Sequence, residues 1–246
     1  MAIGPLEGIT VVDLTSVVVG PLCTQILADH GAEVIKVEAS KGDLARNLNG
    51  KSVTPSMGAK FLHLNRNKRS IVLDLKKPAG FAALKKLLAK ADVMVWNVRP
   101  AAMARLKLAY EDVKAINPRI IYCGMFGFGQ DGRYRAKPAF DGIIQGASGM
   151  AGLFQRSGDR PRNVPLVAAD KVVGLIAVQM ITMALLQRTR TNEGCAIEIP
   201  MFENFVKFVM EEHMYLKTFE PPLGGWGDPR LLDPKSGPLA TKDGHI

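Results

Sequence analysis

One aspartate stands out among the residues whose types could do chemistry. Asp170 lies in the segment NVPLVAADKVVGLIAV, near the start of an apolar stretch that predicts a long helix over residues 166–188. The helix dipole alone favours a carboxylate in the first turn of a helix, and that structural role requires no ligand. The alternative is a carboxylate held at a cleft, between basic loops at 126–138 and 156–165, as a nucleophile toward an activated acyl carbon. The position of Asp170 leaves both roles open.

A glycine-rich loop offers a second possible chemistry. Residues 127–132, GFGQDG, match the G-x-G-x-x-G pattern and follow a predicted strand. In dinucleotide-binding proteins a helix begins at these glycines, so that its amides face the pyrophosphate. Here the loop continues as RYRAKP, Pro138 precedes the next predicted helix, and the acidic residue expected about 20 positions later has no clear candidate. We therefore expect a plain glycine loop and no NAD site.

Other common catalytic and metal-binding patterns are missing from the sequence. Ser148 in GASGM lacks the final glycine of a G-x-S-x-G nucleophile elbow, and no histidine lies near it in sequence. The histidines share no ligand spacing, and the cysteines form no C-x-x-C pair. We therefore expect no metal site and no disulfide framework, which fits a reducing cytoplasm. The residues concerned are His30, His63, His213, His245, Cys23, Cys123 and Cys195.

Charge and hydropathy narrow the possible partners. The net charge is +9, but the basic residues are scattered without a long Lys/Arg block, which argues against nucleic acid and favours a small ligand with several phosphates. The apolar stretch 172–186 is shorter than the roughly 20 residues that span a bilayer, so we interpret it as a buried helix. The amino terminus does not resemble a signal peptide. We expect a soluble, cytoplasmic protein.

The remaining pattern alternates strands and helices. Such alternation predicts an α/β, Rossmann-like fold, with a mostly parallel sheet and helices on both faces. An apolar stripe of Phe81, Leu84, Leu87, Leu88 and Ala91 marks the helix that opens at Lys77-Pro78. The predicted strands are 9–14, 34–37, 69–75, 93–98, 120–125 and 195–199, and further helices are 21–30, 140–153 and 202–216.

The composition changes near residue 218. Residues 1–217 are predicted to form one large Rossmann-like domain, and residues 218–246, which begin with TFEPPLGGWGDPR, read as a linker and the start of a smaller domain. The sequence stops at TKDGHI, which resembles a hairpin turn whose second strand has only begun. A strand without a partner is a poor place for a domain to end, so we expect an amino-terminal fragment with an incomplete second domain.

Several ordered motifs between Leu6 and Glu203 resemble the family III CoA-transferases. This family contains formyl-CoA and carnitine CoA-transferases and also α-methylacyl-CoA racemase. One such motif alone would be weak, but their number and order make the resemblance specific. The motifs are Gly20-Pro21, residues 27–38 (LADHGAEVIKVE), Gly42-Asp43 with Arg46, residues 65–76 (NRNKRSIVLDLK), residues 97–100 (NVRP), residues 127–130 (GFGQ), Phe140-Asp141, Val164-Pro165, Asp170 and Gly174.

The resemblance assigns roles to individual positions. The family's nucleophilic aspartate falls on Asp170. Its CoA-contacting positions fall on two segments after predicted strands and on one helix, and the cations there suit a ligand with a 3′-phosphate and a pyrophosphate. By this resemblance the residues that bind CoA are Leu73, Lys76, Asn97, Val98, Arg99 and Arg105.

Two departures from the family pattern bear on the reaction. Ala39 replaces a basic residue that often follows the LADHGAEVIKVE segment, which weakens one contact to CoA. In the racemases a histidine precedes the aspartate that matches Asp141, but here that position is Phe140. Proton abstraction from two faces needs two titratable groups, so the resemblance favours a transferase over a racemase.

The implied activity moves CoA from an acyl-CoA donor to a carboxylic acid acceptor, through an aspartyl-CoA thioester on Asp170. It uses acyl-CoA as substrate, with no metal and no redox cofactor, and amides of the glycine loop are candidates to stabilise the oxyanions. Full-length members of this family form interlocked homodimers. An acyl-CoA racemase or lyase and a non-catalytic CoA-binding fragment are the alternatives, and the sequence does not show which acids are exchanged.

Overall fold

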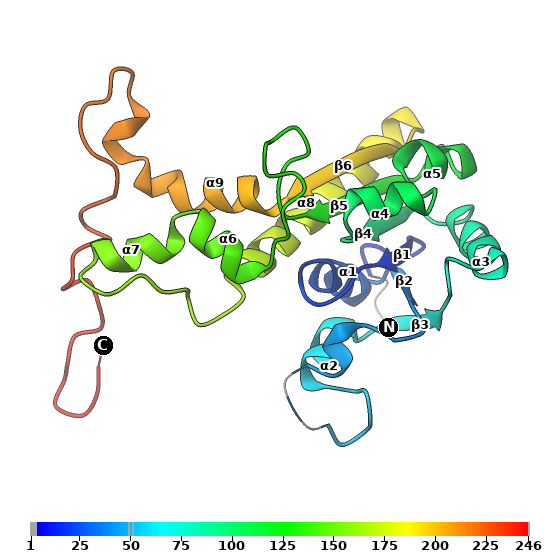
Figure 1. The fold of residues 1–246 in the computed structure, drawn as a ribbon, viewed down its shortest axis with the longest axis horizontal. Coiled ribbons are helices and arrows are strands. Elements are labelled where there is room, and N and C mark those ends of the chain that lie inside the picture. Colours follow the sequence, from blue (N-terminus) through cyan, green and yellow to red (C-terminus); the bar gives the residue numbers. More distant parts are fainter. Residues whose placement is uncertain (1–3, 49, 51, 246) are drawn as a thin grey trace. The chain divides into compact units, whose positions relative to one another are not determined.

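The fold is built around a parallel β-sheet. The computed structural model describes residues 4–48, 50 and 52–245. These residues form a six-stranded sheet in the order β3-β2-β1-β4-β5-β6, and every neighbouring pair in it is parallel (Figure 1). The strands are β1 (Thr10–Leu14), β2 (Glu33–Glu38), β3 (Lys68–Val72), β4 (Val93–Trp96), β5 (Ile121–Phe126) and β6 (Cys195–Pro200). This is the strand order of Rossmann folds, so the predicted fold class is confirmed.

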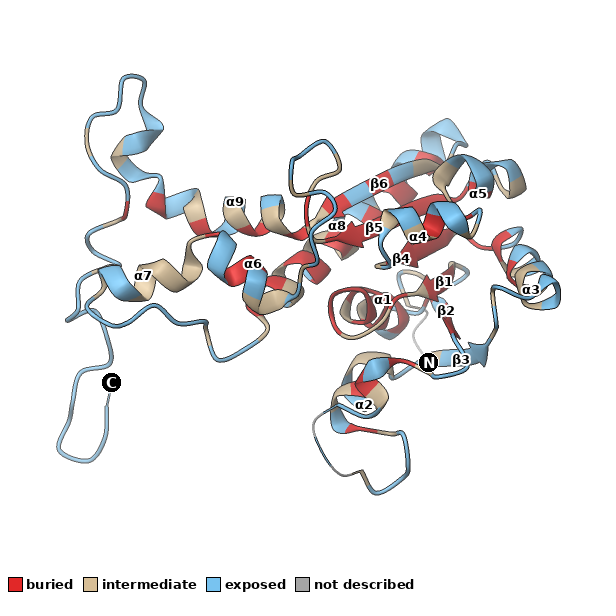
Figure 2. Cartoon of the chain, viewed as in Figure 1, coloured by how far each residue is buried: buried red, intermediate tan, exposed pale blue. Residues whose placement is uncertain are grey.

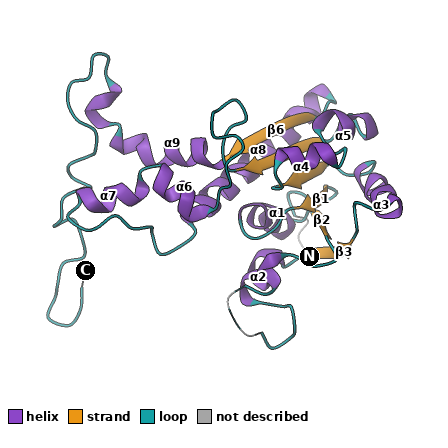
Figure 3. Cartoon of the chain, viewed as in Figure 1, coloured by secondary structure: helices purple, strands orange, loops and turns teal. Residues whose placement is uncertain are grey.

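The chain divides into two compact units. The first, which we call the sheet unit, comprises Met1–Phe126 and Asp170–Pro200, and the second, the helical unit, comprises Gly127–Ala169 and Met201–Ile246. The helices of the sheet unit are α1 (Val19–Asp29), η1 (Leu44–Arg46), α2 (Ala59–Asn65), α3 (Pro78–Leu88), α4 (Pro100–Arg105), α5 (Tyr110–Ile116) and nearly all of α8 (Ala168–Thr191). The helical unit holds α6 (Asp141–Ala147), α7 (Met150–Arg156), α9 (Met201–His213) and η2 (Tyr215–Thr218) (Figure 3).

Both faces of the sheet are covered by helices. On one face Val12 of β1 belongs to an apolar cluster with Leu84 and Leu88, two residues of the stripe that the sequence predicts for α3. The next residue, Asp13, points to the other face, where Thr24 of α1 donates a hydrogen bond to it. Every residue of β4 and β5 is buried, as expected for central strands of a parallel sheet (Figure 2).

Several predicted boundaries are wrong. The predicted helix 140–153 is two helices, α6 and α7, because Gly149 between them adopts a left-handed φ of 88° that ends the first. Strand β3 ends at Val72 rather than at residue 75, and the chain turns at Asp74, whose carbonyl accepts from the Lys77 amide. Helices α2 and α5 lack an apolar stripe long enough to reveal them in the sequence.

Helix α8 (Ala168–Thr191) lies close to the predicted helix 166–188 and extends beyond the apolar stretch 172–186 on both sides. With 24 residues and a mean hydropathy of 1.7 in its most apolar window, it is long and apolar enough to cross a membrane, so length does not exclude that reading. Only 39% of that window is buried, and Leu175, Met183 and Leu186 are exposed, so the expectation of a buried helix holds only in part. A single helix of this kind is weak evidence for a membrane protein. Near its end Arg188 donates to the carboxylate of Asp92 and to the carbonyl of Arg119, which ties the helix to the sheet unit.

Candidate active site

The carboxyl ends of the strands meet at one edge of the sheet. Because all the strands are parallel, the segments that follow β1, β2, β3 and β4 lie along this edge. The strand order reverses between β1 and β4, since the chain after β1 continues to β2 on one side and β4 lies on the other. Sheets of this topology bind their ligands in the crevice at such a reversal. This edge is therefore the candidate site.

The predicted CoA-contacting residues all lie at or near this edge. Leu73 directly follows β3, and its amide donates to the Glu38 carbonyl across the sheet at 2.9 Å. Lys76 is exposed in the turn before α3. Val98 and Arg99 are exposed after β4, and Arg105, also exposed, is the last residue of α4. Two strands separate β3 from β4, so the two groups lie about 14 Å apart in the hydrogen-bonding direction.

The three predicted cations are available to an anionic ligand. Among the described residues, no ion pair involves Lys76, Arg99 or Arg105. A ligand that reaches both groups must be extended and must carry negative charge at more than one place. CoA, with a pyrophosphate and a 3′-phosphate, is such a ligand.

Asn97 connects the two strands on either side of the reversal. Its side-chain oxygen accepts from the Ser16 amide at 2.9 Å, and its side-chain nitrogen donates to the Ser16 carbonyl at 2.8 Å. Ser16 lies in the loop between β1 and α1. The predicted contact residue Asn97 therefore fixes this loop through its side chain.

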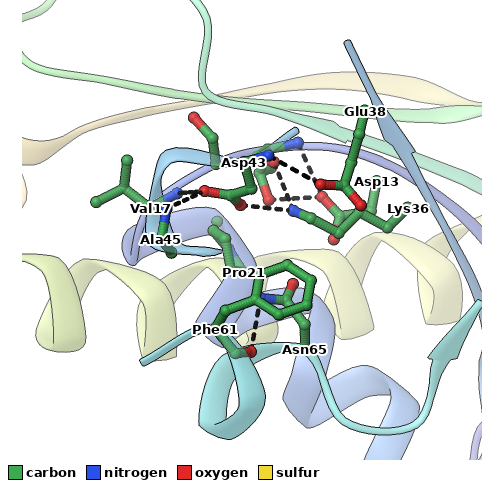
Figure 4. A network of polar contacts seen from close by, with 12 residues as sticks. Asp13, Val17, Pro21, Lys36, Glu38, Asp43, Ala45, Phe61 and Asn65 are labelled. Carbon is green, nitrogen blue, oxygen red and sulfur yellow. Dashed lines mark hydrogen bonds and ion pairs between the residues drawn. The ribbon is translucent and has the colours of Figure 1, made fainter. Parts of the chain in front are cut away.

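Behind the loop lies a buried network of charged side chains that the sequence reasoning missed (Figure 4). Asp13 of β1 and Lys36 of β2 are register partners in adjacent strands, and both are almost fully buried. Lys36 forms an ion pair with Asp43 at 2.9 Å, and Lys68 of β3 forms one with Asp13 at 3.1 Å. Glu38 completes the network with a two-point ion pair to Arg46. The available signal was charge in or directly after predicted strands: Asp13 in TVVDL, and Lys36 and Glu38 in EVIKVE.

The network holds the carboxylates of Asp13 and Glu38 in the ionised form. Burial alone raises the pKa of Asp13, but the cations Lys68 and Lys36 and the hydroxyls of Thr15 and Thr24 outweigh it and lower the pKa to about 2. Burial likewise acts to raise the pKa of Glu38, and hydrogen bonds from Arg46, Ser70 and the Asp43 amide lower it to about 2. Both groups are therefore anionic at neutral pH.

Asp170 lies in the first turn of α8, as the sequence predicts, and is half-buried. One turn later, Gly174 packs so closely against α1 that a Cβ there would lie 2.9 Å from the Val19 carbonyl. Val19 is the first residue of α1, directly after the loop that Asn97 fixes. At 1.5 Å per residue, Asp170 is about 6 Å along the helix from this contact. The start of α8 therefore brings Asp170 to the same edge of the sheet.

The glycine loop belongs to the helical unit and is already internally bonded. The Gly129 amide donates to Glu203 Oε1 at 2.8 Å, and the Gly132 amide donates to the Gly129 carbonyl at 3.2 Å. These two amides are therefore engaged, which argues against them as donors to an oxyanion. The next helix begins only at Asp141, which agrees with the expectation that the glycines do not form a dinucleotide motif.

Within the described residues, a metal-binding cluster would need histidines, cysteines or carboxylates close together. No group of three or more His, Cys, Asp or Glu side chains there could hold a metal ion. Cys23 and Cys123 are buried thiols, and burial raises the pKa of each well above its usual range.

Sequence comparison identifies the family. The sequence model of CoA-transferase family III matches residues 6–246, so the chain belongs to this family. Among its relatives, succinate–glutarate CoA-transferase of Agrobacterium fabrum is 36% identical over 226 residues, which cover 89% of this chain and 56% of the relative. Alpha-methylacyl-CoA racemase of Homo sapiens is 35% identical over 224 residues, which cover 89% of this chain and 54% of the relative.

A solved structure shares the fold. A CAIB/BAIF family protein from Brucella suis superposes with a TM-score of 0.88 at 32% identity, covering 99% of this chain and 65% of that one. The chain thus spans about half the length of the curated relatives it matches.

Proposed function

We propose that the protein is a CoA-transferase that moves CoA from an acyl-CoA donor to a carboxylic acid through an aspartyl-CoA thioester on Asp170. The observation that carries the proposal is the close packing of Gly174 on Val19, which sets Asp170 at the edge where the strand order reverses. The basic side chains Lys76, Arg99 and Arg105 near this edge suit the phosphates of CoA.

The proposed reaction needs only the carboxylate of Asp170 as a reacting group of the protein. Asp170 attacks the thioester carbonyl of the donor, which releases CoA thiolate and leaves a mixed anhydride. The thiolate attacks the aspartyl carbonyl, so that the donor acid leaves and an aspartyl-CoA thioester remains. The acceptor carboxylate attacks this thioester, the thiolate leaves again, and it then attacks the acceptor carbonyl. Acceptor-CoA forms and Asp170 is regenerated, with no net proton or electron transfer.

The relatives suggest which acids to test first. The relative from Agrobacterium fabrum is a succinate–glutarate CoA-transferase, and an acetyl-CoA:oxalate CoA-transferase of Acetobacter aceti is 39% identical over 217 residues. Succinate, glutarate and oxalate are dicarboxylic acids. We therefore propose short dicarboxylates as acceptors, with succinyl-CoA and acetyl-CoA as the first donors.

Trapping the intermediate tests the reaction. The protein is incubated with each acyl-CoA and then with hydroxylamine, which converts an aspartyl thioester to an aspartyl hydroxamate that peptide mass spectrometry locates. We expect the hydroxamate on Asp170 only, and none in Asp170→Asn, whose amide is a far poorer nucleophile. Asp159→Asn serves as a control, because Asp159 pairs with Arg162 in an exposed loop. A variant Asp170→Asn within about tenfold of wild-type turnover would refute the assignment.

An acyl-CoA racemase is the second candidate, because one relative carries that name. Phe140, where the racemases carry a histidine by the resemblance, is 69% exposed and supplies no titratable group. A racemase exchanges the α-proton of a 2-methylacyl-CoA with solvent, so incubation in deuterium oxide separates the two reactions. We expect CoA transfer without deuterium incorporation.

The organisation of the whole protein is part of this proposal. Residues 1–217 would form the CoA-binding domain, followed by a linker and a smaller domain from residue 218, and two copies would interlock as a cytoplasmic homodimer. Sedimentation of the protein with and without CoA tests the oligomeric state. A monomer at all concentrations would refute the dimer.

A further inference from the structure

The loop between β1 and α1 contains a strained residue. Val17 has a φ of 71°, in the left-handed region. A β-branched side chain is sterically disfavoured there, because its Cβ approaches the backbone too closely. Such a conformation persists only where the surrounding structure enforces it, and such residues are concentrated at functional sites.

Side chains from three other strands or loops hold this loop in place. Asp43, which follows β2, accepts the Val17 amide on Oδ1 at 3.1 Å. Lys36 of β2 donates to the Thr15 carbonyl at 2.8 Å, and Asn97 bonds both the amide and the carbonyl of Ser16. Three consecutive residues are thus fixed through their backbone atoms, which accounts for the persistence of the strained Val17.

Asp43 accepts the hydrogen bond from the Val17 amide, and both of its side-chain oxygens face donors, as only a carboxylate allows. Its Oδ1 accepts from the amides of Val17 and Ala45, and its Oδ2 faces the Lys36 ammonium at 2.9 Å (Figure 4). All three partners are donors. An asparagine in this place would turn its NH₂ group either toward Lys36 or toward the two amides, and a donor would meet a donor in both orientations.

The held loop lies where a ligand is expected. It follows β1 at the reversal of strand order, and Val19 directly after it contacts Gly174 of α8, one turn from Asp170. We infer that Asp43 is a positioning residue for acyl-CoA: by holding Val17 in its left-handed conformation, it shapes the β1–α1 loop against which the ligand binds. This inference rests on the proposed function.

The test measures CoA affinity by calorimetric titration at a temperature where circular dichroism shows each variant to be folded. Asp43→Asn should weaken CoA binding about tenfold, because Val17 is no longer held. Glycine adopts the left-handed region without strain, so Val17→Gly in the Asp43→Asn background should recover about threefold to tenfold of the affinity. A residue that only stabilised the fold would lower the melting temperature and leave the affinity of the folded protein unchanged.

Two control variants make the comparison specific. Ser16→Gly in the Asp43→Asn background loosens the same loop at a residue outside the left-handed region, and it should not restore binding. Glu33→Gln removes one negative charge as Asp43→Asn does, but from an exposed ion pair with Arg69 at the start of β2, and it should bind as the wild type does. Equal recovery by Ser16→Gly, or equal weakening by Glu33→Gln, would overturn the inference.

The outcomes separate the inference from the proposed function. Wild-type protein that does not bind CoA would refute both. Wild type and Asp43→Asn that bind CoA equally would refute the positioning role and leave the proposed function intact. If Asp43→Asn fails to fold, Val17→Pro replaces it, because proline is locked near a φ of −65° and cannot adopt the observed conformation. Retained CoA binding by folded Val17→Pro would overturn the inference.

Discussion

Replacing Lys68 by methionine tests the energetics of the buried network. Lys68 Nζ donates to Asp13 Oδ2 at 3.1 Å, to the Pro21 carbonyl at 3.0 Å and to Asn65 Oδ1 at 2.9 Å, and its side chain is 1% exposed. Methionine fills a similar volume but leaves Asp13 facing only one cation. Removing one partner of a buried ion pair costs about 3–5 kcal/mol where the remaining charge is left uncompensated, and Lys36 and the hydroxyls of Thr15 and Thr24 offset part of that cost here.

The next residue provides the matched control. Arg69 also forms an ion pair from β3, with Glu33, but the two side chains are 80% and 50% exposed. An exposed pair contributes about 0–1 kcal/mol. We therefore expect Lys68→Met to lower the free energy of unfolding by at least about 2 kcal/mol more than Arg69→Met does. Urea unfolding followed by circular dichroism at pH 7 measures both values. Since domains are stable by about 5–15 kcal/mol, the loss should be easily measured.

Acid should reduce this difference. The pKa of Asp13 is lowered from 3.8 to about 2 in the folded protein, so the unfolded chain binds the proton first as the pH falls. The contribution of Asp13, about 2 kcal/mol, is present above pH 4 and is lost as the pH falls through about 2. Protonated Asp13 needs no cation, so the gap between wild type and Lys68→Met should narrow between pH 4 and pH 2. The reasoning would be refuted if Lys68→Met lowered the free energy of unfolding by less than about 1 kcal/mol at pH 7. It would also be refuted if the difference between wild type and Lys68→Met did not change with pH.

Three further predictions concern the site. Lys76→Ala and Arg105→Ala should each weaken CoA binding, and added salt should weaken wild-type binding, because ion pairs to phosphate are screened; unchanged affinity in both variants by calorimetric titration would remove them from the site. Glu203→Gln should speed hydrogen exchange of the Gly129 amide, since the carboxylate is its acceptor, while exchange in the sheet should not change. Gly174→Ala should lower transfer activity, because its Cβ would press on the Val19 carbonyl and displace the start of α8, and a variant with full turnover would contradict the placement of Asp170.

Local pattern predicted much of the fold. The β-branched runs around Val12 and Val95 and the stripe of Leu84 and Leu88 gave the strands and helix α3 at nearly their observed positions. These signals are local, because buried side chains recur every two residues along one face of a strand and every 3–4 residues along one face of a helix. Predicted boundaries of helices were wrong where the conformation of a single residue ended the helix, as at Gly149.

The chain by itself determined the family, the α/β fold and the place of Asp170 in the first turn of a helix, because motifs and hydrophobic periodicity are properties of neighbouring residues. Only the tertiary structure decided which distant side chains meet. Asp13 and Lys68 are 55 residues apart, and Ser16 and Asn97 are 81 apart, yet each pair is in direct contact. Strand order and register create these contacts, and no local pattern encodes them. The conformation of Val17 and the carboxylate that holds it were visible only once the strands had been brought together.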